Sequence, residues 1–491
     1  MNYEIKKSEI IASLLWKLME RGGTQGIQFI VMVVLARLLL PEEFGLIVLV
    51  TIFISISGVF VQSGFSTALI QKKDTKEVDY SSVFYLSLFV ASLVYLILFF
   101  AAPLISIFFE QTEFTTILRI LSLTLFLGAF NSVQNAIISK NMQFKKLFFS
   151  SFGAIVISGI IGIVMAYKGF GVWSLVSYQL TNQLTVTIIL CFTVKWKPHL
   201  MFSIDRIKTL FSFGWKLLVS SLIDTINNNV RNIIIGKMFS PATLGFYNRG
   251  DQLPNLIVSN INGSIQSIML PTLSSYQDDK LRVKEIVRRS IVTSSFVVFP
   301  MMVGLAIIAE PLIKILLTEK WLPTVPFLQI FCAVYALWPI HTANLQAINA
   351  LGRSDIFLNL EIKKKIIGLF FLGVSLPFGV HVMTIGIFAS GIIATFINAY
   401  PNLTLLDYSF KEQLKDIIPC LLISLVMGVA VYPIKWFEMS DMLTVIFQIG
   451  TGILIYIVLA IAFKLECFTY LLNTIKEMFG RKKGTVIKGI F

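Results

Sequence analysis

Polar and charged side chains recur at helical spacing inside segments of this chain that are otherwise apolar. They form three stripes: Lys17, Arg21, Gln25 and Gln28; Asp224, Asn227, Asn228, Arg231 and Asn232; and, just past Arg249 and Asp251, Gln252, Asn255, Ser259, Asn262 and Gln266. Spacings that are mostly three or four residues place the members of each stripe along one face of an α-helix. Guanidinium groups bind phosphate oxygens in bidentate fashion, and amides form hydrogen bonds with hydroxyls. Such stripes could therefore bind an anionic ligand that is rich in hydroxyl groups.

These stripes supply the candidate substrate-binding residues. The set is Arg21, Gln25, Gln28, Asp224, Asn227, Asn228, Arg231, Arg249, Asn255 and Asn262. An ionised side chain at the centre of a membrane helix costs roughly 2.5–3.5 kcal/mol, so such residues usually face a bundle interior or a hydrated cavity. Two alternatives stay open. Lys17 and Arg21 could extend to the membrane surface from a long first helix, and Asp224 and Arg231 could form a purely structural ion pair. Arg249 could also act only as a gate or a helix cap.

The sequence contains no recognisable catalytic, metal-binding or cofactor-binding constellation. The three histidines, His199, His341 and His381, are scattered, and no Gly-rich loop with its lysine is present to bind nucleotide phosphates. The spacing of the four cysteines fits neither a metal site nor a disulfide framework. His341, near Asn344 and Gln346, could line a cavity or relay protons, but we favour a hydrogen-bonded structural role. We therefore predict that the chain is not an enzyme and uses no metal or cofactor.

Composition indicates what kind of elements position these residues. Of the 491 residues, 56% are hydrophobic and only 14% are charged, and the mean hydropathy is +0.81. A soluble chain averages about 25% charged residues, and a membrane-spanning helix needs about 20 mostly apolar ones. We predict an all-α polytopic membrane protein with about fourteen transmembrane helices. The predicted spans are 10–39, 44–69, 81–109, 115–138, 148–167, 171–194, 207–236, 244–270, 291–317, 324–349, 357–378, 384–406, 416–434 and 443–463.

The distribution of positive charge predicts the orientation of these spans. The net charge is +14, and 29 of the 41 Lys and Arg residues fall on alternate connections and termini, against 8 on the opposite side. The positive-inside rule then places both termini in the cytoplasm and makes the number of spans even. The excess charge could also hold anionic lipid headgroups. A nucleic-acid partner is not expected, because no connection is long enough to form a folded basic domain.

Two halves of the chain repeat a short pattern. Trp16-Lys17-Leu18 is repeated as Trp215-Lys216-Leu217. Residues 36–45 are similarly repeated as residues 236–245: in both, a small residue and a basic residue are followed after three residues by proline, and after three more by glycine. Each copy predicts a long helix that ends in a tight turn, since proline cannot extend a preceding helix and glycine permits close approach. We predict two six-helix lobes, 1–202 and 203–406, related by a pseudo-two-fold axis along the membrane normal. Residues 407–491 would add two further transmembrane helices and a basic cytoplasmic tail.

Several motifs carry a resemblance to a known family. They are Leu35–Gly45, Gly64–Gln71, Gly169–Leu175, Phe213–Lys216, Gly245–Gly250 and Leu351–Asp355. In order and spacing they resemble the polysaccharide exporters, the Wzx-type flippases of the multidrug/oligosaccharidyl-lipid/polysaccharide superfamily. The similarity is greatest to the subgroup around the teichuronic acid and colanic acid exporters, and it is weakest after about residue 407.

The resemblance implies a function as well as a fold. It implies two lobes around a central cavity that opens alternately to each side of the bacterial cell (inner) membrane. The implied cargo is an undecaprenyl-diphosphate-linked oligosaccharide for lipopolysaccharide, capsule or exopolysaccharide. Membrane lipids and the glycosyltransferases or polymerase of the same pathway are the implied partners. Two extra terminal spans resemble the lipid II flippase branch, where they are thought to seat the lipid tail. Lipid II, a small-molecule cargo exported with cation coupling, and a membrane enzyme of polysaccharide assembly remain alternatives.

Overall fold

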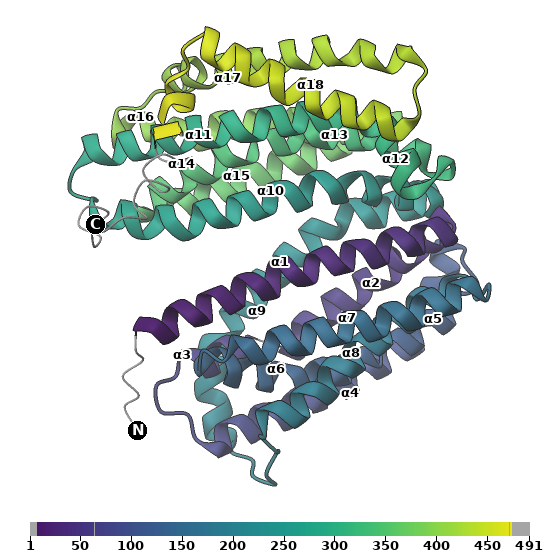
Figure 1. The fold of residues 1–491 in the computed structure, drawn as a ribbon. Coiled ribbons are helices and arrows are strands. Elements are labelled where there is room, and N and C mark those ends of the chain that lie inside the picture. Colours follow the sequence, from purple (N-terminus) through teal and green to yellow (C-terminus); the bar gives the residue numbers. More distant parts are fainter. Residues whose placement is uncertain (1–6, 63, 471, 474–491) are drawn as a thin grey trace. The chain divides into compact units, whose positions relative to one another are not determined.

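The fold is given by a computed structural model that describes residues 7–62, 64–470 and 472–473. These residues form α-helices, three short 3-10 helices and the turns between them (Figure 1). The chain divides into two compact units, Met1–Gly245 and Phe246–Phe491, and each is described by itself. The predicted lobe boundary at 202/203 concerns the internal repeat and stays a prediction.

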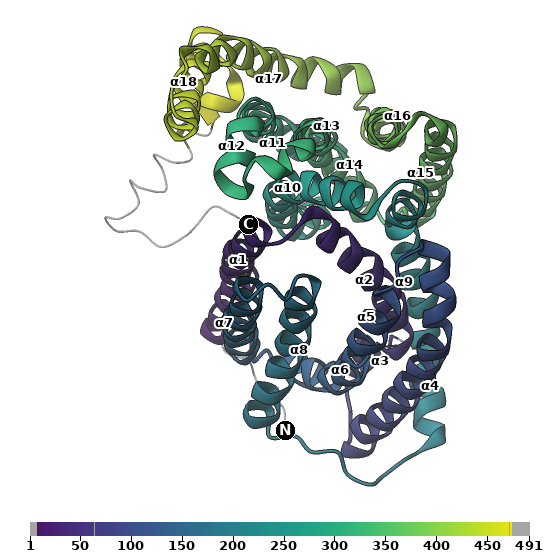
Figure 2. The ribbon, with the colours of Figure 1, turned by 90° about the vertical axis from the view of Figure 1, so that its right-hand side faces the viewer.

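The first unit contains nine helices within the described residues and the start of a tenth. They are α1 (Lys7–Leu38), α2 (Pro41–Gln62), α3 (Phe65–Gln71), α4 (Glu77–Phe109), α5 (Phe114–Leu121), α6 (Thr124–Lys140), α7 (Phe144–Tyr167), α8 (Val172–Val194), α9 (Ile204–Met238) and the beginning of α10 (Pro241–Ser275). Helix α1 packs on α7, and α7 packs on α8. Figure 2 shows α1 beside α7 with the helices of this unit viewed nearly end-on.

The second unit holds the rest of α10 and all the later elements. They are α11 (Lys280–Ile307), α12 (Ala309–Leu317), η1 (Glu319–Thr324), α13 (Val325–Ala336), α14 (Trp338–Ala350), α15 (Ser354–Ser375), η2 (Leu376–Phe378), α16 (Val380–Leu406), α17 (Phe410–Val431), η3 (Tyr432–Phe437) and α18 (Asp441–Ala462). Helix α17 packs on α11, and α18 packs on α12 and α17. The two C-terminal helices thus belong to the hydrophobic core of this unit.

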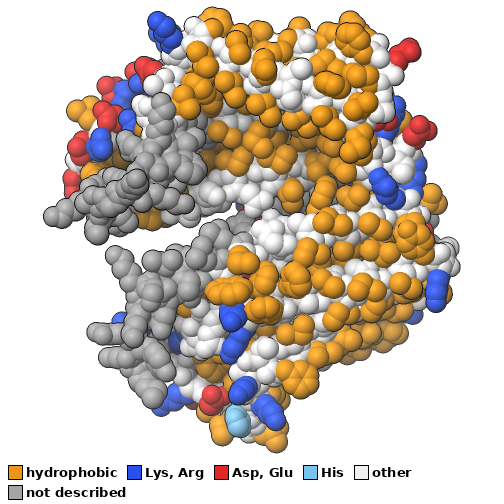
Figure 3. Space-filling view, in the orientation of Figure 1, with side chains coloured by type: hydrophobic (Ala, Val, Ile, Leu, Met, Phe, Trp, Pro, Cys, Tyr) orange, Lys and Arg blue, Asp and Glu red, His pale blue; other side chains and the backbone are white. Residues whose placement is uncertain are grey.

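The prediction of an all-α polytopic membrane protein is confirmed. Among the described residues, ten helical segments are long and apolar enough to cross a membrane. In each unit the space-filling view shows hydrophobic side chains over the helix faces and charged ones near the helix ends (Figure 3). The long helices α9, α10 and α15 are not among the ten, because they are too polar over an 18-residue window. Within the described residues, α1 contributes only the shorter apolar stretch Gly22–Leu38. The count of fourteen spans therefore stays a prediction.

The two predicted tight turns are confirmed, and they have the same form. Helix α1 ends at Leu38 and α2 begins at Pro41, while α9 ends at Met238 and α10 begins at Pro241. The two turns also pack against each other. A Cβ atom on Gly45 would overlap the backbone of Pro241, and one on Gly245 would overlap the carbonyl of Pro41.

An ion pair fixes the start of α9 to the first unit. The carboxylate of Asp79, near the start of α4, is fully buried and accepts two hydrogen bonds from Arg206 Nη1, at 2.9 and 3.0 Å. Lys72 Nζ donates to the same carboxylate at 2.9 Å. At the other end of α9, Lys237 Nζ donates to Glu110 Oε1 at 2.9 Å, which lowers the pKa of that exposed carboxyl. Helix α9 is therefore fastened to α4 at both ends.

A similar ion pair fixes α17 to the second unit. Arg288 on α11 donates to Asp416 on α17, with Nε–Oδ2 at 2.9 Å and Nη2–Oδ1 at 2.8 Å. Tyr408 Oη donates to the same carboxylate at 2.7 Å. Deeper in the unit, Gln413 on α17 exchanges two hydrogen bonds with Asn344 on α14, at 2.9 and 3.0 Å. These contacts explain why α17 packs tightly on the preceding bundle.

Candidate functional site

The stripe on α1 lies partly outside the described residues. Helix α1 contains Arg21, but the side chain of Arg21 lies outside the part of the chain that the structure describes. Lys17 is half exposed and forms an ion pair with Glu20 on the same helix, with Nζ–Oε2 at 3.5 Å. Gln25 is half-buried and Gln28 is exposed. Whether Lys17 and Arg21 extend to the membrane surface stays an open alternative.

Within the first unit, the side chains of the stripe on α9 are exposed or half-buried. Asp224 and Asn228 are exposed, whereas Asn227 and Arg231 are half-buried. Arg231 makes no hydrogen bond or ion pair with a described residue, and its Nε atom is buried without a partner. The structural alternative, an ion pair between Asp224 and Arg231, is not found among the described residues. A buried donor without a partner costs about 1–3 kcal/mol, and an anionic ligand that accepted a hydrogen bond from Arg231 would remove this cost.

On α10, the structure packs Arg249 into the second unit. Its guanidinium donates to Gln252 one turn further along and lies over the ring of Trp321, with Cζ 5.7 Å from the ring centroid. Trp321 is fully buried and comes from η1. These contacts fix the orientation of the guanidinium, so Arg249 is a packed residue and Arg231 is the more accessible cation of the two.

Asn255 and Asn262 lie two turns apart on α10, and their environments differ. Asn255 is half-buried and donates to Asp251 Oδ2 at 3.5 Å. Asn262 is only 4% exposed, and its Oδ1 atom is buried without a hydrogen-bond partner. Leaving such an acceptor unpaired costs about 1–3 kcal/mol. A ligand or water that donates to Asn262 would remove this cost.

A carboxylate next to this stripe has a partner that sequence reasoning missed. Asp251 accepts a hydrogen bond from Tyr335 Oη on α13 at 2.6 Å. No local signal connects the two residues, which are 84 positions apart in the chain. Asp251 is also bonded to Asn255, so α10 and α13 are joined by a small polar network beside Arg249. The network orients the polar face of α10.

His341 has the structural role that the sequence favoured. Its Nε2 atom lies 3.1 Å from Thr395 Oγ1 and its Nδ1 atom 2.8 Å from Asn398 Nδ2, both on α16. Asn402 on the same helix donates to Asn344 Oδ1 at 2.7 Å. Both ring nitrogens are thus used in joining α14 to α16. Within the described residues, no group of three or more His, Cys, Asp or Glu side chains is placed to hold a metal ion.

The second unit also contains an apolar cavity of about 400 Å³. It lies where α11, α17 and α18 meet and is lined by Ile257, Pro300, Met301, Gly304, Leu305, Ile307, Ile308, Met427, Val431, Gln448, Ile449, Gly452, Ile453, Tyr456 and Ile457. Gln448 supplies one of the few polar atoms in this wall, and its Oε1 is buried without a partner. A cavity of this kind suits a hydrocarbon chain better than a sugar.

Comparison with known proteins places the chain among proteins of polysaccharide biosynthesis. Residues 34–326 match the family described as "Polysaccharide biosynthesis protein". The succinoglycan biosynthesis transport protein ExoT of Rhizobium meliloti is 26% identical over 310 residues, which cover 62% of this chain and 62% of that protein. The teichuronic acid biosynthesis protein TuaB of Bacillus subtilis is 26% identical over 306 residues, covering 61% of this chain and 62% of that protein. The match thus spans less than two thirds of the length of these relatives.

Solved structures share the fold. The lipid II flippase MurJ in an inward closed conformation superposes with a TM-score of 0.75 at 17% identity, covering 92% of this chain and 98% of that chain. A multidrug resistance MATE family transporter of the MOP superfamily in an inward-facing conformation superposes with a TM-score of 0.58 at 15% identity, covering 78% of this chain and 96% of that one. At these identities the similarity establishes the fold alone.

Proposed function

The chain belongs to the family of polysaccharide biosynthesis proteins, and from this premise we propose that it flips a polyprenyl-diphosphate-linked oligosaccharide across the bacterial cell membrane by alternating access. The proposed orientation places both termini in the cytoplasm, as the excess of Lys and Arg on alternate connections favours. The chain then acts as a transporter and carries out no bond-making step.

One observation carries this proposal. Helices α9 and α10 bear two of the polar stripes, and both are too polar to count as membrane spans by composition. A helix of this kind in a membrane protein must turn its polar face toward water, protein or a polar ligand. In the first unit, the free guanidinium of Arg231 suits a phosphate group. In the second unit, the unpaired amide oxygen of Asn262 can accept a hydrogen bond from a sugar hydroxyl.

The apolar cavity supports a lipid-linked cargo rather than a free sugar. A polyprenyl chain needs a hydrocarbon-like surface, and the cavity between α11, α17 and α18 offers one of about 400 Å³. The two C-terminal helices supply much of its wall. This is consistent with the role that the resemblance implies for extra terminal spans.

Export of surface polysaccharide by Arg231 variants tests the proposal. In a strain that lacks the native gene, Arg231→Ala and Arg231→Gln should abolish export, and lipid-linked oligosaccharide should accumulate in the inner leaflet. Arg231→Lys should retain partial export, because the charge survives but the bidentate geometry does not. Lys216→Gln, an exposed cation on the same helix, is the matched control and should export normally. Immunoblots of membranes must show equal protein levels.

Other outcomes would identify other cargoes. Full export by Arg231→Gln would remove Arg231 from the mechanism. Normal polysaccharide in the deletion strain with increased sensitivity to cationic drugs would favour a small-molecule exporter. Restored growth of cells depleted of their lipid II flippase would identify the peptidoglycan precursor as the cargo.

A further inference from the structure

A second cavity of about 560 Å³ lies at the opposite end of the α11–α17 contact from Pro300 and Val431. It is lined by Glu285, Arg288, Arg289, Val292, Thr293, Lys415, Asp416, Pro419, Cys420, Lys464, Leu465, Glu466, Cys467 and Tyr470. These residues come from α11, α17 and the segment after α18. In the orientation that the charge distribution favours, this end of the unit faces the cytoplasm.

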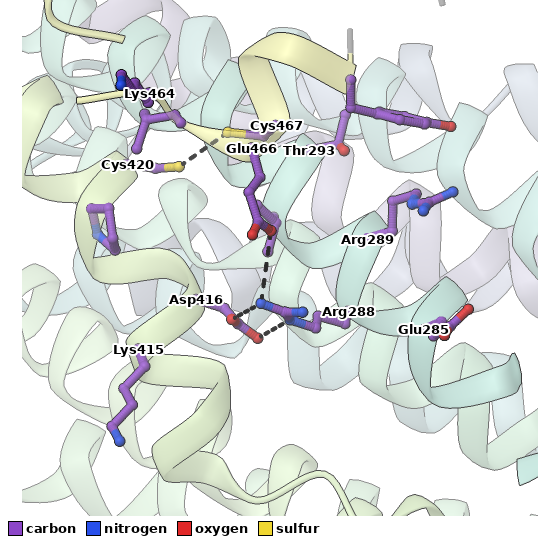
Figure 4. Close-up of a pocket in the computed structure, with 14 residues that line it drawn as sticks. Glu285, Arg288, Arg289, Thr293, Lys415, Asp416, Cys420, Lys464, Glu466 and Cys467 are labelled. Atoms are coloured by element: carbon purple, nitrogen blue, oxygen red, sulfur yellow. Dashed lines mark hydrogen bonds and ion pairs between the residues drawn. The ribbon is translucent and has the colours of Figure 1, made fainter. Parts of the chain in front are cut away.

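The charges in this cavity are only partly neutralised. Figure 4 shows Arg288 held between Asp416 and Glu466, and the nearest oxygen of Glu466 is 4.0 Å away. Glu285 is paired with Arg282 outside the cavity wall. Arg289, Lys415 and Lys464 make no ion pair with a described carboxylate. The guanidinium of Arg289 instead lies over the ring of Tyr470, 4.6 Å from its centroid. Three cations therefore surround a cavity whose acidic groups are already occupied.

The surroundings of these cations are apolar. Val292, Pro419 and Leu465 line the same cavity. One turn beyond Pro419, the exposed side chains Leu422, Leu425, Val426 and Val429 form a stripe along α17. A ligand bound here would therefore meet cations at one end and a hydrocarbon-like helix face at the other. A phospholipid matches both regions, because its phosphate headgroup is anionic and its acyl chains are apolar. A free inorganic anion would contact only the cations.

We propose that this cavity, formed by α11, α17 and the segment after α18, binds the phosphate headgroup of an anionic glycerophospholipid of the inner leaflet. Arg289, Lys415 and Lys464 provide the positive charge, and the α17 stripe contacts the acyl chains. Arg288 and Asp416 hold the two helices together and form the wall of the site. The bound lipid would join the two C-terminal helices to α11.

Lipid binding to the purified full-length protein tests this proposal. Native mass spectrometry in detergent would count bound phosphatidylglycerol and phosphatidylcholine at increasing concentration. We expect selective retention of phosphatidylglycerol. The variant Arg289→Gln/Lys415→Gln/Lys464→Gln should lose at least about tenfold in apparent affinity for it, since each cation near an anionic lipid contributes to binding. The control Lys280→Gln/Lys363→Gln/Lys411→Gln removes three exposed cations outside the cavity and should retain the lipid.

A second variant tests whether lipid binding depends on the cavity itself and not only on the net charge of the protein. Thr293→Trp would fill the cavity without changing its charge and should also reduce phosphatidylglycerol binding. Equal retention of both lipids, or unchanged binding in both cavity variants, would overturn the proposal. Displacement of the lipid by millimolar inorganic phosphate would also overturn it, because the cavity would then be a site for small anions and not for a lipid.

Discussion

Gly45 and Gly245 lie where the starts of α2 and α10 meet, each against the proline that begins the other helix. A Cβ atom at either glycine would overlap backbone atoms, which cannot move away as a flexible side chain could. This contact gives a reason for the glycine in each copy of the repeated pattern. The pattern therefore specifies both a helix turn and a place where two such turns pack together.

We predict that Gly45→Ala destabilises the protein by about 1–3 kcal/mol, since overpacking against backbone forces the helices apart. The matched control is Gly58→Ala on the same helix, where a Cβ atom would meet nothing within 4 Å. There alanine should be neutral or stabilising by up to about 1 kcal/mol through its helix propensity. Thermal unfolding of the purified variants measures both effects. An equal melting temperature for the two variants would contradict the packing explanation.

At the scale of helices, an ion pair joins two helices in each unit. In the first unit the earlier helix carries the carboxylate, and in the second unit the earlier helix carries the guanidinium. In the first unit, the carboxylate of Asp79 lies near the start of α4 and its guanidinium partner, Arg206, near the start of α9. In the second unit, Arg288 lies near the start of α11 and its carboxylate partner, Asp416, near the start of α17. Helix α17 is thus fastened to its bundle as α9 is fastened to the first unit.

Removing the buried member of such a pair should be costly. We predict that Asp79→Ala lowers the free energy of unfolding by about 1–3 kcal/mol, because Arg206 and Lys72 lose their common carboxylate partner but are partly exposed to solvent. Asp74→Ala, at an exposed position in the same connection, should change it by less than about 0.5 kcal/mol. Denaturation of the purified protein in detergent would measure the difference. Similar stability of the two variants would show that the Asp79 cluster does not hold α9.

For the whole molecule, the orientation in the membrane rests on the charge distribution. Labelling of introduced cysteines tests it, in a background whose four native cysteines are replaced by serine. In the connection before α4, the exposed Asp74 is a suitable labelling position. The neighbouring Thr75 is not, because its hydroxyl is hydrogen-bonded to Tyr80 and Lys140. We predict that Asp74→Cys and Asp278→Cys react only after the cells are opened. Glu319→Cys should react on intact cells with a membrane-impermeant reagent. The reverse labelling pattern would invert the orientation and with it the proposed direction of transport.

The sequence by itself determined the helices and the turns between them. An apolar run long enough to span a membrane, and a Pro that begins a helix after a tight turn, depend only on residues near each other in the chain. For this reason the tight turns lie where the prolines predicted them, although α2 and α10 begin at Pro41 and Pro241, three residues before the predicted spans 44–69 and 244–270. Helical spacing alone also places Arg231 on a polar stripe, and its role in ligand binding stays a prediction. Each of these features depends on interactions between residues that are close together in the chain, so it can be predicted from the sequence.

Only the tertiary structure decided which side chains meet. Tyr335 is 84 residues from Asp251, and Asp416 is 128 residues from Arg288, yet each pair is joined by hydrogen bonds. Whether two such residues meet depends on how each helix is rotated about its axis and on which helix packs beside it. These properties follow from the burial of many side chains at once, not from any one segment. Helix packing therefore determines three features: the packed state of Arg249, the free guanidinium of Arg231, and the cationic cavity at the end of α11 and α17.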